Sequence, residues 1–127
     1  MRESRFYKRL NTDLACTVFT DDRELSGEVL NICEDGIGLE LDYENCRGID
    51  PGKDPKLSIQ FVDSYTVGPD SFTDSILMQA MIVHAEDTGH SFRFGCKLFR
   101  NYKSELDYLS YVDRKKAGDF LRRLAYT

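Results

Sequence analysis

The sequence predicts a mainly β domain, a six-stranded antiparallel barrel followed by one C-terminal helix. A chain of 127 residues suffices for one globular domain. Six short runs alternate apolar and polar side chains, and after Tyr102 the spacing changes to that of an amphipathic helix. Closure into a barrel would remove exposed strand edges, with the helix covering an open end. The single domain, residues 1–127, divides into a basic arm over 1–12, a barrel over 13–99 and a helix over 103–125.

The first three strands are expected between residues 13 and 41, where apolar residues recur at every second position. The second and third of them cover 25–32 and 36–41. Between these two strands, Asp35 and Gly36 predict a hairpin, because glycine adopts a positive φ at little cost.

Three further strands are expected over residues 57–62, 76–85 and 92–99. Two loops are expected before them, one over 42–55 and one over 63–74, where a Gly-Pro-Asp sequence interrupts the alternation. The last two strands are joined by a short polar connection that contains a Thr-Gly pair.

In the helix, Ser104 is a candidate N-cap, and Gly118 could break it because glycine costs about 1 kcal/mol relative to alanine. The tyrosines at positions 102, 108 and 111 could form a partner-binding stripe, yet this spacing more often indicates core packing. The other apolar positions lie three, four or eight residues apart: Leu106, Leu109, Val112, Phe120 and Leu124.

The net charge of −5 hides an uneven distribution. Residues 1–10 sum to +3, so the rest of the chain carries −5 − 3 = −8. An acidic body argues against binding of DNA, RNA or an anionic membrane. No 18-residue apolar run and no apolar stretch behind the N-terminal cations is present, so we expect neither membrane insertion nor secretion. The charges of the arm are those of Arg2, Glu3, Arg5, Lys8 and Arg9.

The cysteines and histidines indicate neither a disulfide framework nor a metal site. The four cysteines lack Cys-x-x-Cys spacing, and we expect reduced thiols in a cytoplasmic protein. His84 and His90 flank a turn but lack a third ligand, so both are interpreted as surface histidines. Cys33 precedes two carboxylates, whose negative charge disfavours a nucleophilic thiol at this position. We therefore expect no enzyme, no metal and no cofactor.

Two segments carry the residues that suggest a ligand. Arg5 and Arg9 stand four apart in the arm, and Asn31, Cys33 and Gly36 lie at the expected hairpin. An R-x-x-x-R followed about twenty residues later by N-x-C-x-x-G resembles the PilZ domain family, receptors for the bacterial second messenger cyclic di-GMP. The resemblance extends to the Gly-Ile-Gly-Leu continuation at 36–39, the Pro-Gly loop at 51–52 and the strand at 94–99. It implies a PilZ-type barrel.

The resemblance also implies a role for each residue of the two motifs. Arg5 and Arg9 would clamp phosphate and guanine, because a guanidinium forks onto phosphate oxygens and onto guanine O6 and N7. Asn31 would bond a guanine edge, Cys33 would add a short polar contact, and Gly36 would leave room for the base. Cys33 replaces the usual serine, which would cost roughly 0.5 to 1.5 kcal/mol, or up to about tenfold in affinity.

The expected function is a non-enzymatic cyclic di-GMP receptor whose arm is flexible without ligand and orders upon binding. The signal would pass to an unidentified downstream protein, in motility, pilus or exopolysaccharide control. The alternative is an adaptor on the same fold that acts through protein contacts without binding cyclic di-GMP. Taken singly, a basic arm is usually solvated and the hairpin is only a turn, so the prediction depends on their joint occurrence.

Overall fold

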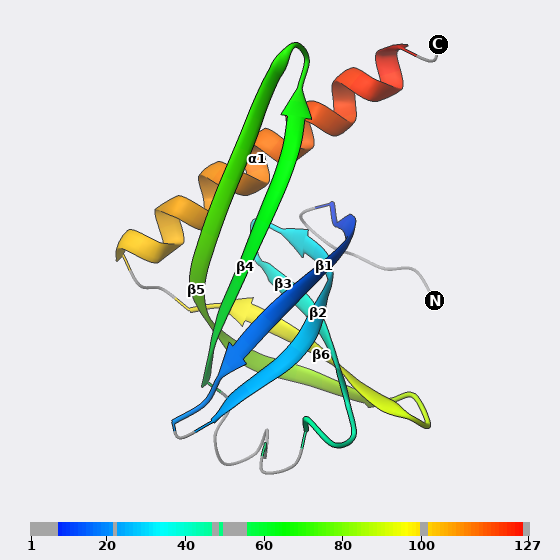
Figure 1. Cartoon of the computed structure of the whole chain (residues 1–127), viewed down its shortest axis with the longest axis vertical. Helices are drawn as coiled ribbons and strands as arrows, with labels where there is room; N and C mark the ends of the chain where they lie inside the picture. Colours follow the sequence, from blue (N-terminus) through cyan, green and yellow to red (C-terminus); the bar gives the residue numbers. More distant parts are fainter. Residues whose placement is uncertain (1–7, 22, 47–48, 50–55, 100–101, 126–127) are drawn as a thin grey trace.

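A computed structural model describes residues 8–21, 23–46, 49, 56–99 and 102–125. It confirms the predicted mainly β fold with a C-terminal helix (Figure 1). The strands and the helix are β1 Leu10–Phe19, β2 Glu24–Cys33, β3 Gly36–Asp42, β4 Lys56–Val67, β5 Asp70–Asp87, β6 Ser91–Leu98 and α1 Tyr102–Ala125.

The six strands close into an antiparallel barrel in the order β1-β2-β3-β6-β5-β4, with β1 returning to pair with β4. Alternate residues of each strand point inward, as the period-two pattern predicted. β1 begins at Leu10, three residues before the boundary expected at 13, and Leu10 pairs with Ile32 of β2. The largest fully buried side chains of the strands are Val18, Val29, Ile32, Leu39, Leu41, Ile59 and Met78.

The prediction of a loop over residues 63–74 is wrong. β4 and β5 remain paired through this segment and turn only at 68–69, where Gly68 has a φ of +59°. Their hairpin extends beyond the barrel and lies along α1 (Figure 1). The sequence does not show an alternation of apolar and polar residues here, because the face turned toward α1 carries polar and aromatic residues, including Asp63, Tyr65 and Asp74, in place of aliphatic ones.

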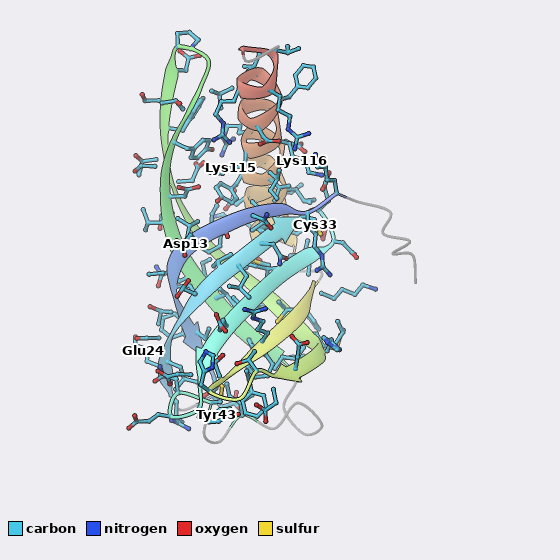
Figure 2. The ribbon with its side chains drawn as sticks, turned by 90° about the vertical axis from the view of Figure 1, so that its right-hand side faces the viewer. Asp13, Glu24, Cys33, Tyr43, Lys115 and Lys116 are labelled. Carbon is cyan, nitrogen blue, oxygen red and sulfur yellow. The ribbon has the colours of Figure 1, made fainter. Side chains whose placement is uncertain are left out.

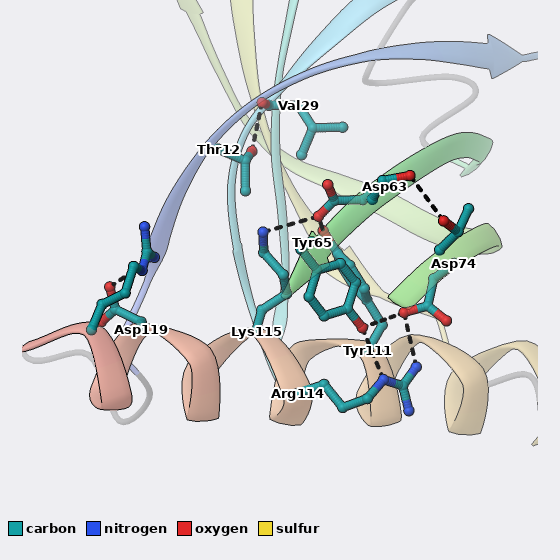
Figure 3. Close-up of polar contacts among 12 residues, drawn as sticks. Thr12, Val29, Asp63, Tyr65, Asp74, Tyr111, Arg114, Lys115 and Asp119 are labelled. Atoms are coloured by element: carbon teal, nitrogen blue, oxygen red, sulfur yellow. Dashed lines mark hydrogen bonds and ion pairs between the residues drawn. The ribbon is translucent and has the colours of Figure 1, made fainter. Parts of the chain in front are cut away.

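Helix α1 docks on this hairpin through two groups of polar contacts (Figure 3). The buried Asp63 carboxylate accepts a hydrogen bond from the Tyr111 hydroxyl at 2.8 Å and forms an ion pair with the Lys115 ammonium at 3.0 Å. Arg114 donates to the Tyr65 hydroxyl at 2.8 Å and to Asp74 at 3.0 Å. The carboxylates on the inner face of the hairpin are therefore neutralised by cations of the helix.

Two expectations about α1 were wrong. Ser104 is the third residue of the helix and not its cap, and its buried hydroxyl has no hydrogen-bond partner among the described residues. The helix does not break at Gly118. A Cβ at Gly118 would lie 3.0 Å from the carbonyl oxygen of Thr66, so the missing side chain lets α1 approach β4 closely. Tyr108 and Tyr111 are fully buried, which confirms that they pack in the core.

The hairpin between β2 and β3 forms, but not for the expected reason. The chain turns at Glu34 and Asp35, and Cys33 pairs with Gly36. Among the described residues only Gly68 and Gly89 have a positive φ, so Gly36 does not supply one. A Cβ at Gly36 would lie 2.0 Å from the carbonyl oxygen of Cys96, and glycine is needed there because β3 and β6 approach closely.

Within the described part of the chain, no helix is both long and apolar enough to cross a membrane.

Candidate ligand-binding groove

A groove of about 570 Å³ runs over the outer face of four neighbouring strands, β2, β3, β6 and β5. Four of the five predicted site residues line it: Arg9, Asn31, Cys33 and Gly36. The fifth, Arg5, lies outside the described residues. The structure therefore brings the end of the arm and the β2–β3 hairpin to one concave surface. The remaining lining residues are Leu30, Asp35, Ile37, Gly38, Val83, His84, Glu86, Arg93, Phe94, Gly95, Cys96 and Lys97.

The middle of the groove is a row of four residues, one from each strand. Asn31 of β2 pairs with Gly38 of β3, Gly38 pairs with Gly95 of β6, and Gly95 pairs with His84 of β5. Cross-strand partners lie side by side on one face of a sheet. The side chains of the row therefore come only from its two ends, Asn31 and His84.

Two β-bulges set the ends of this row. Leu30 is the extra residue between Val29 and Asn31 in the pairing of β2 with β3. Val83 is the extra residue between Ile82 and His84 in the pairing of β5 with β6. A bulge shifts the alternation by one residue and re-aims the side chain that follows it. Ile82 is buried, and after the bulge His84 lies opposite the outward-facing Gly95.

The two glycines of the row differ in the space above them. A Cβ at Gly38 would lie 2.8 Å from both terminal atoms of the Asn31 amide, so that amide lies across Gly38. A Cβ at Gly95 would meet only the Cβ of His84, at 3.5 Å, which is ordinary van der Waals contact. Sequence reasoning did not assign Gly95 and His84 to the site. The available signal was a glycine between Arg93 and Lys97 on the polar face of a strand.

The charged residues of the groove nearly balance. Arg9, Arg93 and Lys97 contribute three cations and Asp35 and Glu86 two carboxylates, a sum of +1 before His84 is counted. This local excess contrasts with the acidic body and suits an anionic ligand that also presents polar edges.

Arg93 is held at the rim of the groove by Glu40, 3.4 Å away. The hydroxyl of Ser91 donates to the same Glu40 carboxylate at 2.7 Å. This hydrogen bond, followed by the contact with Arg93, lowers the pKa of Glu40, so the carboxylate stays charged opposite Arg93.

Helix α1 fixes the β2–β3 turn from the other side. The buried Tyr108 hydroxyl lies 2.9 Å from the Cys33 carbonyl oxygen and 2.5 Å from that of Gly36, and donates to this pair. The Lys116 ammonium donates to Glu34 at 2.5 Å. Figure 2 shows Cys33 and Lys116 at the same end of the barrel. The backbone that carries the predicted motif is therefore anchored to the helix at both sides of the turn.

No cluster of three or more His, Cys, Asp or Glu suited to a metal ion occurs in the described ranges. The four cysteines are free thiols. Burial raises the pKa of Cys16 to about 11 and that of Cys96 to about 12, so these core thiols are poor nucleophiles.

Comparison with known families gives one match, the PilZ domain, over residues 3–110. No curated protein matches the sequence. The solved structures of similar fold include three proteins whose alignments each cover 91% of this chain.

The first is MotI/DgrA, the inhibitor of motility of Bacillus subtilis, with a TM-score of 0.61, 15% identity and 52% of its chain covered. The second is the PilZ domain of YcgR from Escherichia coli with c-di-GMP, with a TM-score of 0.56, 15% identity and 98% of its chain covered. The third is PlzA of Borreliella burgdorferi in complex with c-di-GMP, with a TM-score of 0.57, 14% identity and 52% of its chain covered. The chain thus spans about half the length of the first and third, and at these identities the likeness is one of fold.

Proposed function

Because the chain belongs to the PilZ domain family, as its motifs predicted, we propose that it is a receptor that binds cyclic di-GMP in the groove over β2, β3, β6 and β5. One observation carries the proposal. Arg9 and the hairpin residues Asn31, Cys33 and Gly36 are far apart in the sequence, yet they line the same groove. A turn and a basic arm that served only the fold would have no reason to share a concave surface.

The proposed contacts follow from the chemistry of each side chain. Arg9, with Arg5 four residues before it, would grip phosphate and guanine, since guanidinium groups bind both bidentately. Asn31 offers an amide donor and acceptor to a base edge, and the Cys33 thiol offers a weak polar contact. Gly36 acts indirectly, because its missing Cβ allows β6 to close one side of the groove.

The proposed receptor carries out no reaction on the ligand and passes the signal to a protein partner. Ligand phosphates would draw the basic residues of the arm against the groove, and the ordered arm would present a new surface. Motility control is one candidate output, since a protein of similar fold is an inhibitor of motility; pilus and exopolysaccharide control are the others that the resemblance suggests.

A second candidate function is an adaptor that works by protein contacts without cyclic di-GMP. The observation that favours it is Cys33, which replaces the serine usual in the motif with a weaker hydrogen-bonding group. The Arg9 and Asn31 side chains on the groove favour the receptor, because an adaptor does not need them there.

Calorimetric titration with cyclic di-GMP separates the two. We expect the wild-type chain to bind and Arg9→Ala to bind about ten- to a hundredfold more weakly, the loss of one charge-assisted contact. Arg122→Ala is the matched control, because the Arg122 side chain is exposed and pairs with Asp119 within α1. Absence of binding heat up to about 100 μM ligand, a free energy of about −5.5 kcal/mol, would refute the receptor and favour the adaptor.

A further inference from the structure

His84 lies at the end of the row Asn31–Gly38–Gly95–His84, opposite Asn31, and belongs to neither ligand motif. Resting on the proposed function, we propose that a guanine of cyclic di-GMP lies flat on the Gly95 backbone, beside the Asn31 amide that covers Gly38, and that His84 is a specificity-determining residue that donates a hydrogen bond to the guanine O6.

The floor is suited to a planar ring. On an ordinary sheet face, side chains stand outward from every second residue of each strand. Gly38 and Gly95 are direct partners on neighbouring strands, about 4.8 Å apart. The Asn31 amide lies across Gly38, whereas the space above Gly95 is open. A base placed there would lie against peptide groups, with its edges toward the two ends of the row.

The two ends of the row are built in the same way. Each follows a bulge whose extra residue is apolar and also lines the groove, Leu30 before Asn31 and Val83 before His84. Val83 has 63% of its surface exposed. A bulge disrupts the ladder and is retained where it re-aims a side chain. The bulge in β5 places His84 opposite Gly95.

The chemistry of the two ends is complementary to guanine. Guanine presents acceptors at O6 and N7, whereas adenine presents an amino donor in place of O6. An imidazole has a ring N–H donor in either protonation state. With this N–H turned toward the base, it would bond O6 of guanine but face a donor on adenine. Asn31, at the opposite end, can both donate and accept. His84 would therefore discriminate between the two purines as well as add affinity.

The test compares variants of the full chain by calorimetry with cyclic di-GMP and with cyclic di-AMP. His84→Ala should weaken cyclic di-GMP binding about two- to tenfold and reduce the preference over cyclic di-AMP by a similar factor. A merely structural role would weaken both ligands in parallel. His90→Ala is the matched control, because His90 is exposed at the β5–β6 turn and does not line the groove.

A second variant tests the floor independently. Gly95→Ala places a methyl group where the fold has room, 3.5 Å from the His84 Cβ, so the thermal midpoint should not fall. The methyl would hold the base off the backbone and weaken cyclic di-GMP binding about five- to a hundredfold.

The outcomes separate the two proposals. If the wild-type chain binds, and both His84→Ala and Gly95→Ala keep its affinity for cyclic di-GMP and its preference over cyclic di-AMP, this inference is overturned and the proposed function stands. Absence of binding by the wild-type chain overturns both. Weaker binding by Gly95→Ala, together with a narrowed purine preference in His84→Ala, supports the inference.

Discussion

Replacing Tyr108 by phenylalanine removes one hydroxyl from the contact between α1 and the β2–β3 turn. That hydroxyl is fully buried and lies 2.9 Å and 2.5 Å from the carbonyl oxygens of Cys33 and Gly36. The variant keeps the ring and its packing but leaves buried acceptors without their donor, which costs about 1–3 kcal/mol. For a domain of this length, about 4 °C of midpoint shift per kcal/mol gives an expected fall in Tm of roughly 4–12 °C.

The assay is thermal unfolding followed by circular dichroism, with the free energy checked by urea denaturation. Tyr43→Phe is the control, since the Tyr43 hydroxyl donates to Asp87 on an exposed surface, and we expect a change within about 0.5 kcal/mol. A Tm for Tyr108→Phe within about 1 °C of wild type would refute the reasoning that this hydroxyl anchors the turn. The same loss in both variants would refute it too, because burial would then not matter.

Three further predictions concern the cysteines, Gly36 and the arm. Burial raises the pKa of Cys16 and Cys96 to about 11 and 12, above the ordinary thiol value, so the stability that these neutral thiols contribute is complete below about pH 8.5 and is lost as pH rises through 11–12. The urea midpoint of the wild-type chain should therefore fall between pH 8 and 11. If the midpoint of a Cys16→Ala/Cys96→Ala variant falls equally steeply, the two thiols are not the cause. Gly36→Ala would put a Cβ 2.0 Å from the Cys96 carbonyl oxygen and should lower stability by about 1–3 kcal/mol or more, measured by urea denaturation; a wild-type midpoint would show that β3 and β6 separate easily. Finally, amides of residues 1–10 should exchange hydrogen more slowly when cyclic di-GMP is bound, and equal exchange with and without ligand would exclude the proposed ordering of the arm.

Local pattern in the sequence determined much of this fold. Alternation predicted all six strands, since each of them buries one face in the barrel and exposes the other. The helix was predictable from its apolar spacing to within one residue of its start at Tyr102. Motif order along the chain identified the family, which the match over residues 3–110 confirms. These features depend on residues close together in sequence or on a fixed linear order.

The length of the β4–β5 hairpin depended on a partner distant in sequence. Asp63 and Tyr65 look like loop residues, yet they form strand because Tyr111, Arg114 and Lys115 of α1 supply their hydrogen bonds and countercharges. The role of Gly36 was hidden for the same reason. Its constraint is the backbone of Cys96, sixty residues away along the chain, and not its own torsion angle.

The groove itself was decided only by strand order and register. The sequence by itself determined that Arg9, Asn31, Cys33 and Gly36 belong to one recognisable pattern. Only the strand order of the barrel placed β6 beside β3, and only the bulge at Val83 put His84 in line with Gly95. A one-residue shift of register turns a side chain to the other face of a sheet, and no local pattern encodes which residue a bulge will leave unpaired.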